Sequence, residues 1–225
     1  MDTLILNIET ATTNCSVALS RNGKTIILKE DFDKNYSHAE RLHVYIDAVL
    51  KEAGVSKKEL HAIAISKGPG SYTGLRIGVS AAKGLCFALD IPLISVATLK
   101  SLAHQVTGAN GVIVPMLDAR RLEVYAAIFD AKHEQIHKTE AQILNENAFA
   151  HYLNQGNVYF IGNGVEKTKT LIQHPNAIFI ENKLPSANDM ALLAFQKYIE
   201  KDFEDVAYFE PYYLKDFVAF NKAEV

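Results

Sequence analysis

Residues 63–98, IAISKGPGSYTGLRIGVSAAKGLCFALDIPLISVAT, predict an apolar strand, a glycine-rich turn, a helix and a second apolar strand. Between Gly74 and Leu89 the helix carries only two charged residues, Arg76 and Lys83. A helix that is apolar nearly all round has to be covered on more than one side. We expect the protein's own sheet to cover one side and a partner to cover the other.

The segments around this stretch predict an α/β unit. Expected strands lie at 3–10, 15–20, 25–30, 61–66 and 92–96, and expected helices at 38–53, 71–89 and 98–106. Asn22-Gly23 is a hairpin signal, Ser37 and Glu40 form a capping box, and Gly54 can end the first helix. This order predicts a hairpin sheet that is extended by parallel strands through crossover helices.

Beyond TGANG at 107–111 the pattern partly repeats, which predicts a duplicated fold. Expected strands lie at 112–117, 122–129, 134–140, 158–163 and 177–182, and expected helices at 145–153 and 190–200, the last capped by Ser186 with Asp189. We therefore expect two related subdomains with mixed sheets, 1–108 and 109–225. The first would carry the partner-binding helices.

Composition limits the classes of function. The chain has 225 residues, of which 48% are hydrophobic, and a formal net charge of -3, so it has no general attraction to nucleic acid. The start MDTLILNIET lacks an export signal and no apolar run reaches membrane-spanning length, which predicts a soluble, cytoplasmic protein. Cys15 and Cys86 lie in apolar segments and are expected to be reduced core thiols.

The glycine turn could bind an anion, because glycines let the backbone approach a phosphate and a helix N-terminus offers N–H groups. It is not a Walker motif, since Gly74 is followed by Leu75 and Arg76. A tight strand-to-helix turn, capped by a hydroxyl, explains the same residues. The candidates for contact with an anion or nucleotide are Thr10, Gly70, Ser71 and Thr73.

Small residues on the helix after the turn predict an interface. Gly74 and Gly78 would let a second helix approach closely, which we favour over the alternative that they fit the helix against its own sheet. The helix at 38–53 carries a parallel apolar stripe. The predicted partner interface comprises Leu42, Tyr45, Ile46, Val49, Gly74, Leu75, Gly78, Ala81, Ala82 and Leu85.

Catalytic and metal-ligating patterns are weak. His38 and His43 are five residues apart, which does not match the spacing of a zinc peptidase, and a solvated first helical turn explains them. No Gly-x-Ser-x-Gly elbow is present. The charged cluster Asp118, Arg120, Arg121 and Glu123 could bind a partner or a phosphate, or form a solvated hairpin tip. We assign no catalytic residue and no metal site.

Several motifs together closely resemble the bacterial TsaB family. They are LNIETATTNCSVAL, SHAERL, KGPGSYTGLRIGVSAAKGL, IPLISVATLKSLA and DARRLEVY in the first 130 residues, and PYYLK at 211–215. The resemblance implies an actin-like, Hsp70-like ATPase fold of the ribonuclease H-like type. It also implies a role in forming N6-threonylcarbamoyladenosine on tRNAs that read codons beginning with A.

In that family, TsaB is the non-catalytic partner of the transferase TsaD, and TsaE joins the two. The resemblance therefore implies TsaD and TsaE as partners, a homodimer when alone, and tRNA contact only through the complex. It implies no intrinsic cofactor, with ATP and metal at the partner subunits. Catalytic relatives carry an Asp in the first strand, at the position that we assign to Asn7, and a metal-binding His-x-x-x-His pair, which none of the motifs quoted above contains. The competing interpretations are an actin-like-fold small-molecule kinase and a glycoprotease-like metallopeptidase.

Overall fold

A computed structural model describes residues 2–31 and 38–215, and its first sheet has five strands. These are β1 (Leu4–Glu9), β2 (Cys15–Arg21), β3 (Lys24–Asp31), β4 (Ala62–Ser66) and β5 (Leu93–Val96). The strand order is β3-β2-β1-β4-β5, antiparallel among β1, β2 and β3 and parallel among β1, β4 and β5. Every residue of β1, β4 and β5 is buried, which is expected of strands covered on both faces.

The second sheet repeats this plan. Its strands are β6 (Val112–Asp118), β7 (Glu123–Phe129), β8 (Gln135–Ile143), β9 (Val158–Ile161) and β10 (Ala177–Ile180). The order β8-β7-β6-β9-β10 is again three antiparallel strands followed by two parallel ones. Two sheets of this topology, one after the other, define the actin-like ATPase fold, so the predicted fold class is confirmed.

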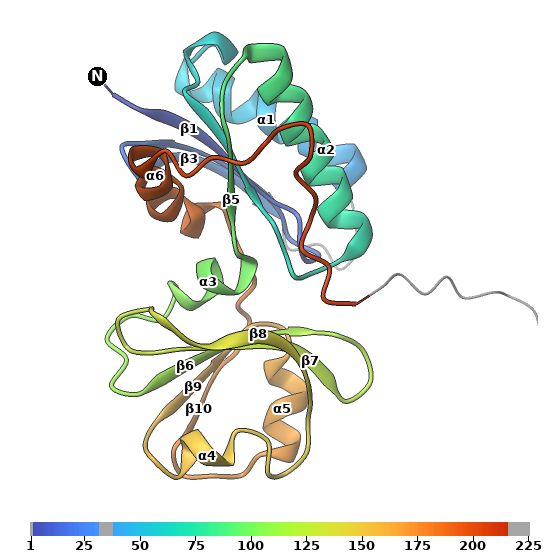
Figure 1. Ribbon diagram of the computed structural model, residues 1–225, viewed down its shortest axis with the longest axis vertical. Coiled ribbons are helices and arrows are strands. Elements are labelled where there is room, and N and C mark those ends of the chain that lie inside the picture. The colour runs from blue at the N-terminus through green and yellow to red at the C-terminus, as the bar shows by residue number, and fades with distance from the viewer. Residues whose placement is uncertain (1, 32–37, 216–225) are drawn as a thin grey trace, which may run out of the picture.

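Helices cover both faces of each sheet (Figure 1). On the first sheet, α1 (His38–Ala53) and α2 (Tyr72–Leu89) pack on one face, and η2 (Ala187–Met190) with α6 (Ala191–Glu200) on the other. On the second sheet, α3 (Thr98–Ala103) packs on one face, and α4 (Ala150–Leu153) with α5 (Val165–Leu171) on the other. A short helix, η1 (Lys57–Glu59), precedes β4.

The two units exchange helices across the predicted division into residues 1–108 and 109–225. α3 lies in the N-terminal half, yet Leu99 and Leu102 pack against the second sheet. α6 lies in the C-terminal half, yet Met190 and Leu193 pack against the first. The crossover helices of each sheet cover only one face, and the exchanged helices bury the apolar side chains of the other.

Other predicted elements differ in extent. The helix expected at 98–106 ends at Ala103. The helix expected at 145–153 begins only at Ala150. α5 was not predicted, because its sequence VEKTKTL has few apolar residues to mark a buried face. The predicted capping box depends on Ser37, which lies outside the described residues.

The segment after α6 crosses back over β5 and α2 (Figure 1). Glu204 N donates to Leu93 O at 2.8 Å, and Tyr212 N donates to Lys67 O at 2.7 Å. Between these points, Lys83 Nζ of α2 donates to the carbonyl oxygens of Ala207 and Phe209 at 3.0 and 2.9 Å. This C-terminal strap, residues 203–213, therefore fixes α2 against its sheet.

Within the part of the chain that the structure describes, no helix combines the length and apolar character that crossing a bilayer requires. Cys15 and Cys86 are free and buried, as predicted.

Candidate functional site

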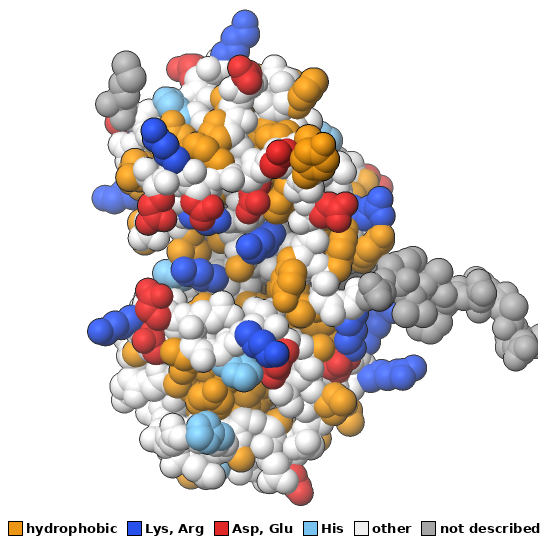
Figure 2. Space-filling model, in the orientation of Figure 1, with side chains coloured by type: hydrophobic (Ala, Val, Ile, Leu, Met, Phe, Trp, Pro, Cys, Tyr) orange, Lys and Arg blue, Asp and Glu red, His pale blue; other side chains and the backbone are white. Residues whose placement is uncertain are grey.

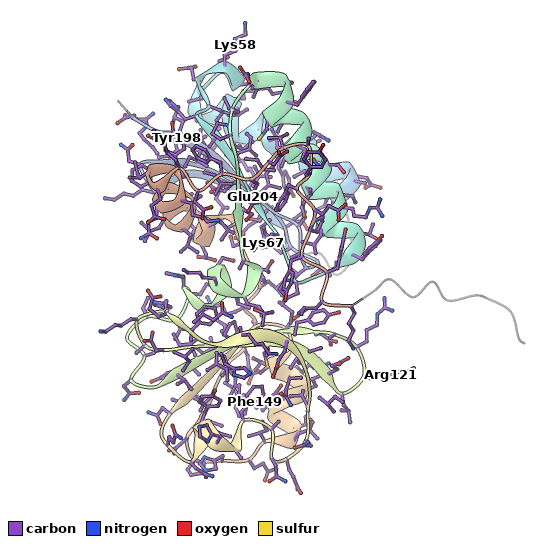
Figure 3. The ribbon with its side chains drawn as sticks, viewed as in Figure 1. Lys58, Lys67, Arg121, Phe149, Tyr198 and Glu204 are labelled. Atoms are coloured by element: carbon purple, nitrogen blue, oxygen red, sulfur yellow. The ribbon has the colours of Figure 1, made fainter. Side chains whose placement is uncertain are left out.

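The parallel strands β1, β4 and β5 end at the same edge of the first sheet, facing the second unit. In open α/β sheets, ligands bind outside the carboxyl ends of such strands. Figure 3 shows Lys67, the residue after β4, between the two units. The turns that leave these strands form the candidate site.

Glu9 is the last residue of β1, and its carboxyl group is fully buried. Ala11 N donates to Glu9 Oε1 at 2.6 Å, and Ser66 Oγ donates to the same oxygen at 2.9 Å. Gly68 N donates to Thr98 Oγ1 at 3.1 Å, and this hydroxyl lies 3.0 Å from Ser66 Oγ. A chain of hydrogen bonds thus connects the glycine turn to the carboxyl group.

Burial raises the pKa of the Glu9 carboxyl from 4.5 to about 7. The hydrogen bonds from Ala11 and Ser66 oppose this rise, and the charge of Asp189 adds to it. The other oxygen, Oε2, accepts no hydrogen bond from the described residues. The site therefore holds a buried carboxyl group whose pKa lies well above the usual range for glutamate.

The assignment of Asn7 as the counterpart of the catalytic Asp is not supported by its position. Asn7 lies in the middle of β1, where its Nδ2 donates to Ser20 Oγ of β2 at 2.9 Å. Glu9, not Asn7, places its side chain at the carboxyl end of the strand. The available signal was that Glu9 is the only acidic residue in the otherwise uncharged strand LILNIE.

The glycine turn is filled by the chain itself. A Cβ at Gly70 would lie 2.5 Å from Ala11 O, and one at Gly74 would lie 2.2 Å from Thr10 O. Ser71 caps α2 by accepting from Gly74 N at 3.3 Å, while its own N–H donates to Ala11 O. The glycines therefore allow the β1–β2 turn to pack on the start of α2.

Of the predicted anion-binding residues, Thr10 is buried, and Gly70 is half-buried with Ala11 packed on the side where a Cβ would lie. Ser71 is half-buried and Thr73 is exposed at the start of α2. Thr10 and Ala11 occupy the side of the turn formed by Gly70 and Gly74. That this turn binds an anion or a nucleotide stays a prediction.

Most of the predicted partner interface lies inside the protein. The buried members are Leu42, Ile46, Val49, Gly74, Leu75, Gly78 and Ala82. Their side chains or Cα atoms pack against the first sheet and the β1–β2 turn, so we correct the interface prediction at these positions. Tyr45, Ala81 and Leu85 are half-buried at the edge of the same core. That α1 and α2 bind a partner stays a prediction, and it concerns their outward sides.

The outward sides carry apolar residues that the sequence pattern did not single out. Phe87 of α2 is 85% exposed and Val44 of α1 is 62% exposed. Gly84 lies one turn before Phe87, and a Cβ there would meet no atom within 4 Å. A shallow hollow lies beside them, lined by Lys83, Gly84, Phe87 and residues 205–207 of the C-terminal strap.

Histidines do not assemble a metal site in the described part of the chain, which contains no group of three or more His, Cys, Asp or Glu side chains placed to hold an ion. His38 is buried, with Nε2 2.7 Å from Thr12 O, whereas His43 is exposed on α1. The expected solvated first turn is therefore wrong for His38, which is buried, and it holds only for the exposed His43.

Comparison with known proteins identifies the family. A family model described as TsaD, tRNA N6-adenosine threonylcarbamoyltransferase, matches residues 33–223. The Escherichia coli protein named tRNA threonylcarbamoyladenosine biosynthesis protein TsaB is 32% identical over 226 residues, 97% of each chain. The chain belongs to the TsaB family.

Other TsaB relatives and solved structures agree. The Haemophilus influenzae TsaB is 28% identical, covering 97% of this chain and 96% of its own. YeaZ from Pseudomonas aeruginosa has a TM-score of 0.80 at 28% identity, covering 94% of this chain and all of that one. A second structure from that organism, an uncharacterized protein with similarity to peptidase YeaZ, has a TM-score of 0.83 over 95% of this chain, again at 28% identity and with all of that chain covered. The likeness in fold therefore covers 94–95% of this chain.

Proposed function

We propose that this chain is the non-catalytic partner of TsaD in forming N6-threonylcarbamoyladenosine on tRNAs that read codons beginning with A. TsaE would join the complex, and nucleotide and metal would bind at the partner subunits. Membership of the TsaB family supports the pathway, since the E. coli relative is named for it. The complex would act in the cytoplasm, with the tRNA.

The outward side of α2 carries this proposal. Phe87 is 85% exposed, and it lies next to a glycine with open space above it and beside a shallow hollow. Aromatic side chains in such settings are typical of the centre of an interface. Val44 extends the apolar character to α1, which packs beside α2. We infer that TsaD, or a second copy of this chain when TsaD is absent, covers this side.

The geometry at the carboxyl ends of the strands supports a non-catalytic role. A general base has to present its carboxylate to a substrate. Glu9 instead has one oxygen engaged by Ala11 N and Ser66 Oγ and the other enclosed in the protein. The packing of Thr10 and Ala11 on the glycine turn removes space that a phosphate would use.

Two substitutions on the outward side of α2 test the proposed interface. Gly84→Arg and Phe87→Asp should each weaken binding to purified TsaD by at least about tenfold, because they place charge in an apolar contact. Neither should change the melting temperature substantially, since both side chains point away from the core. Interferometry with immobilised TsaD measures the binding.

Ile199→Asp is the matched control, because Ile199 is an exposed apolar residue on α6, on the other side of the sheet. It should bind TsaD like the wild type. Wild-type affinity in both α2 variants would refute this interface.

The function itself is tested by assaying tRNA modification with purified TsaD, TsaE and the adenylate-forming enzyme. Equal yields with and without this chain would refute the proposed function.

A further inference from the structure

The tip of the β6–β7 hairpin has an unusual backbone. Arg120 and Arg121 have φ angles of 69° and 49°, in the left-handed region. Among the described residues, they are the only two adjacent non-glycine residues with positive φ. Figure 3 shows Arg121 at the outer end of this hairpin.

Arginine is a poor choice for this conformation. The left-handed region costs a residue with a Cβ roughly 1–2 kcal/mol, and glycine, asparagine and aspartate adopt it more readily. Elsewhere Asn22, Asp90 and Asn182 are favourable types in this region, whereas Phe149 and Lys201 adopt it as single residues. Two consecutive arginines in a strained tip are better explained by what their side chains contact than by the stability of the turn.

Hydrogen bonds from another element hold the backbone of the hairpin tip. Lys167 of α5 donates through Nζ to Arg121 O at 2.9 Å and to Asp118 Oδ1 at 3.1 Å, and also to Glu123 O. Arg120 N donates to Asp118 Oδ1 at 2.6 Å. The backbone that carries the two arginines is therefore fixed by a partly buried lysine on another element.

The charges at the tip do not cancel. Asp118 pairs with Lys167, and Glu123 pairs with Lys215. The carboxylates of the hairpin thus each have a lysine partner, and the two exposed arginines supply the surplus positive charge. This surplus stands out on a chain whose formal net charge is -3.

We propose that Arg120 and Arg121 contact the phosphate backbone of RNA, as a subsidiary contact of this chain with the tRNA held by its complex. Guanidinium groups bind phosphate oxygens through paired hydrogen bonds. A nucleic-acid backbone carries one negatively charged phosphate per nucleotide and no positive groups between them. Two adjacent arginines can therefore each pair with a phosphate. The proposal rests on the proposed function for the identity of the RNA. Because the whole chain is acidic, the contact adds to binding by the complex and does not make this chain an RNA-binding protein alone.

The decisive variant is Arg120→Asn with Arg121→Gly, because it separates stability from binding. Both new residues accept the left-handed conformation, so the melting temperature should rise by about 2–4 °C. Binding of the assembled TsaD–TsaE complex containing this variant to an in vitro transcript of a tRNA that reads codons beginning with A should weaken by about tenfold. The slope of log affinity against log salt should decrease by about one for each phosphate that the variant no longer neutralises.

Two comparison variants sharpen the test. Arg120→Lys with Arg121→Lys keeps the charge and the strain, and should keep most of the salt slope. Lys58→Gln with Lys138→Gln removes the same charge from exposed positions away from the hairpin tip, and should bind like the wild type. Weaker tRNA binding only in the Asn/Gly variant, with TsaD and TsaE still assembled, supports the proposal.

Three results would overturn it. An unchanged salt slope in the Asn/Gly variant rules out the phosphate contact. If the Lys58/Lys138 control loses as much tRNA affinity as the Asn/Gly variant, the loss reflects overall charge and not a contact at the hairpin tip. Failure to assemble with TsaD or TsaE assigns the arginines to an acidic protein surface instead. If the wild-type complex itself neither binds nor modifies the transcript, the proposed function fails with it, and the wild-type sample alone reveals this.

Discussion

Gly74→Ala is expected to destabilise the fold by about 3 kcal/mol, whereas Gly84→Ala on the same helix is expected to stabilise it by about 0.5–1 kcal/mol. Both changes raise helix propensity equally. At Gly74, however, the new Cβ would lie 2.2 Å from the backbone oxygen of Thr10 and 3.2 Å from the His38 ring. At Gly84 it would meet no atom within 4 Å.

Urea unfolding of the two variants measures the difference between their free energies of unfolding. The gain in helix propensity from glycine to alanine is common to both variants, so it cancels in this difference. Gly78→Ala should also destabilise, since its Cβ would lie 2.2 Å from Thr10 Oγ1. This destabilisation should be smaller than at Gly74, because a hydroxyl can rotate and a backbone carbonyl cannot. Equal stabilities for the Gly74 and Gly84 variants would show that the β1–β2 turn does not pack on α2 as described.

Glu9→Gln should stabilise the protein by about 3 kcal/mol at pH 8 and change its stability little at pH 4. Burial raises the pKa of the Glu9 carboxyl to about 7, so the folded protein holds this proton more tightly than the unfolded chain does. The contribution of Glu9 to stability is therefore full below pH 4.5 and decreases as the pH rises to about 7. Glutamine keeps the oxygen that accepts from Ala11 and Ser66 without the buried charge.

The free energy of unfolding is measured from pH 4 to pH 8 for the wild type and for Glu9→Gln. The difference between the two curves gives the stabilisation by Glu9→Gln at each pH. Other titrating groups contribute equally to both. Glu146→Gln is the control, because Glu146 is exposed and the same substitution there removes no buried charge. Parallel curves for wild type and Glu9→Gln would mean that the Glu9 carboxylate reaches solvent in the folded protein.

The order of strands and helices could be predicted from the sequence because local patterns mark each element. Asn22-Gly23 has φ angles of 51° and 79° in the β2–β3 hairpin, as its residue types require. Apolar periodicity placed Leu42, Ile46 and Val49 on one face of α1. It could not say whether a sheet or a partner covers that face, and the structure places all three in the core.

Side-chain spacing on α2 had the same ambiguity. Gly74 and Gly78 are small because a loop of the same chain packs on them, a contact between residues more than sixty positions apart. The outward residue Phe87 was overlooked because one exposed aromatic gives no periodic signal. Figure 2 shows apolar side chains interspersed with charged ones over one face of the molecule. Because exposed apolar residues are common, a single one does not identify an interface from the sequence alone.

The site at the end of β1 was the hardest part to predict. A buried acidic residue is rare, and a single glutamate next to Asn7 in a short strand does not reveal which of the two points to the strand end. The distinction depends on Ser66 and Thr98, which come from two other elements. Only the parallel pairing of β1 with β4 brings these residues together.

The exchange of α3 and α6 between the units has a consequence for synthesis on the ribosome. Ile5, Ala64 and Ile94 are covered by Met190 and its neighbours, which are translated about ninety residues after β5. At about 5–20 residues per second, one face of the first sheet stays uncovered for roughly 5 to 20 s in every new chain. Neither half should therefore be soluble when produced alone, and the nascent first half is a natural client for a chaperone that shields apolar strands.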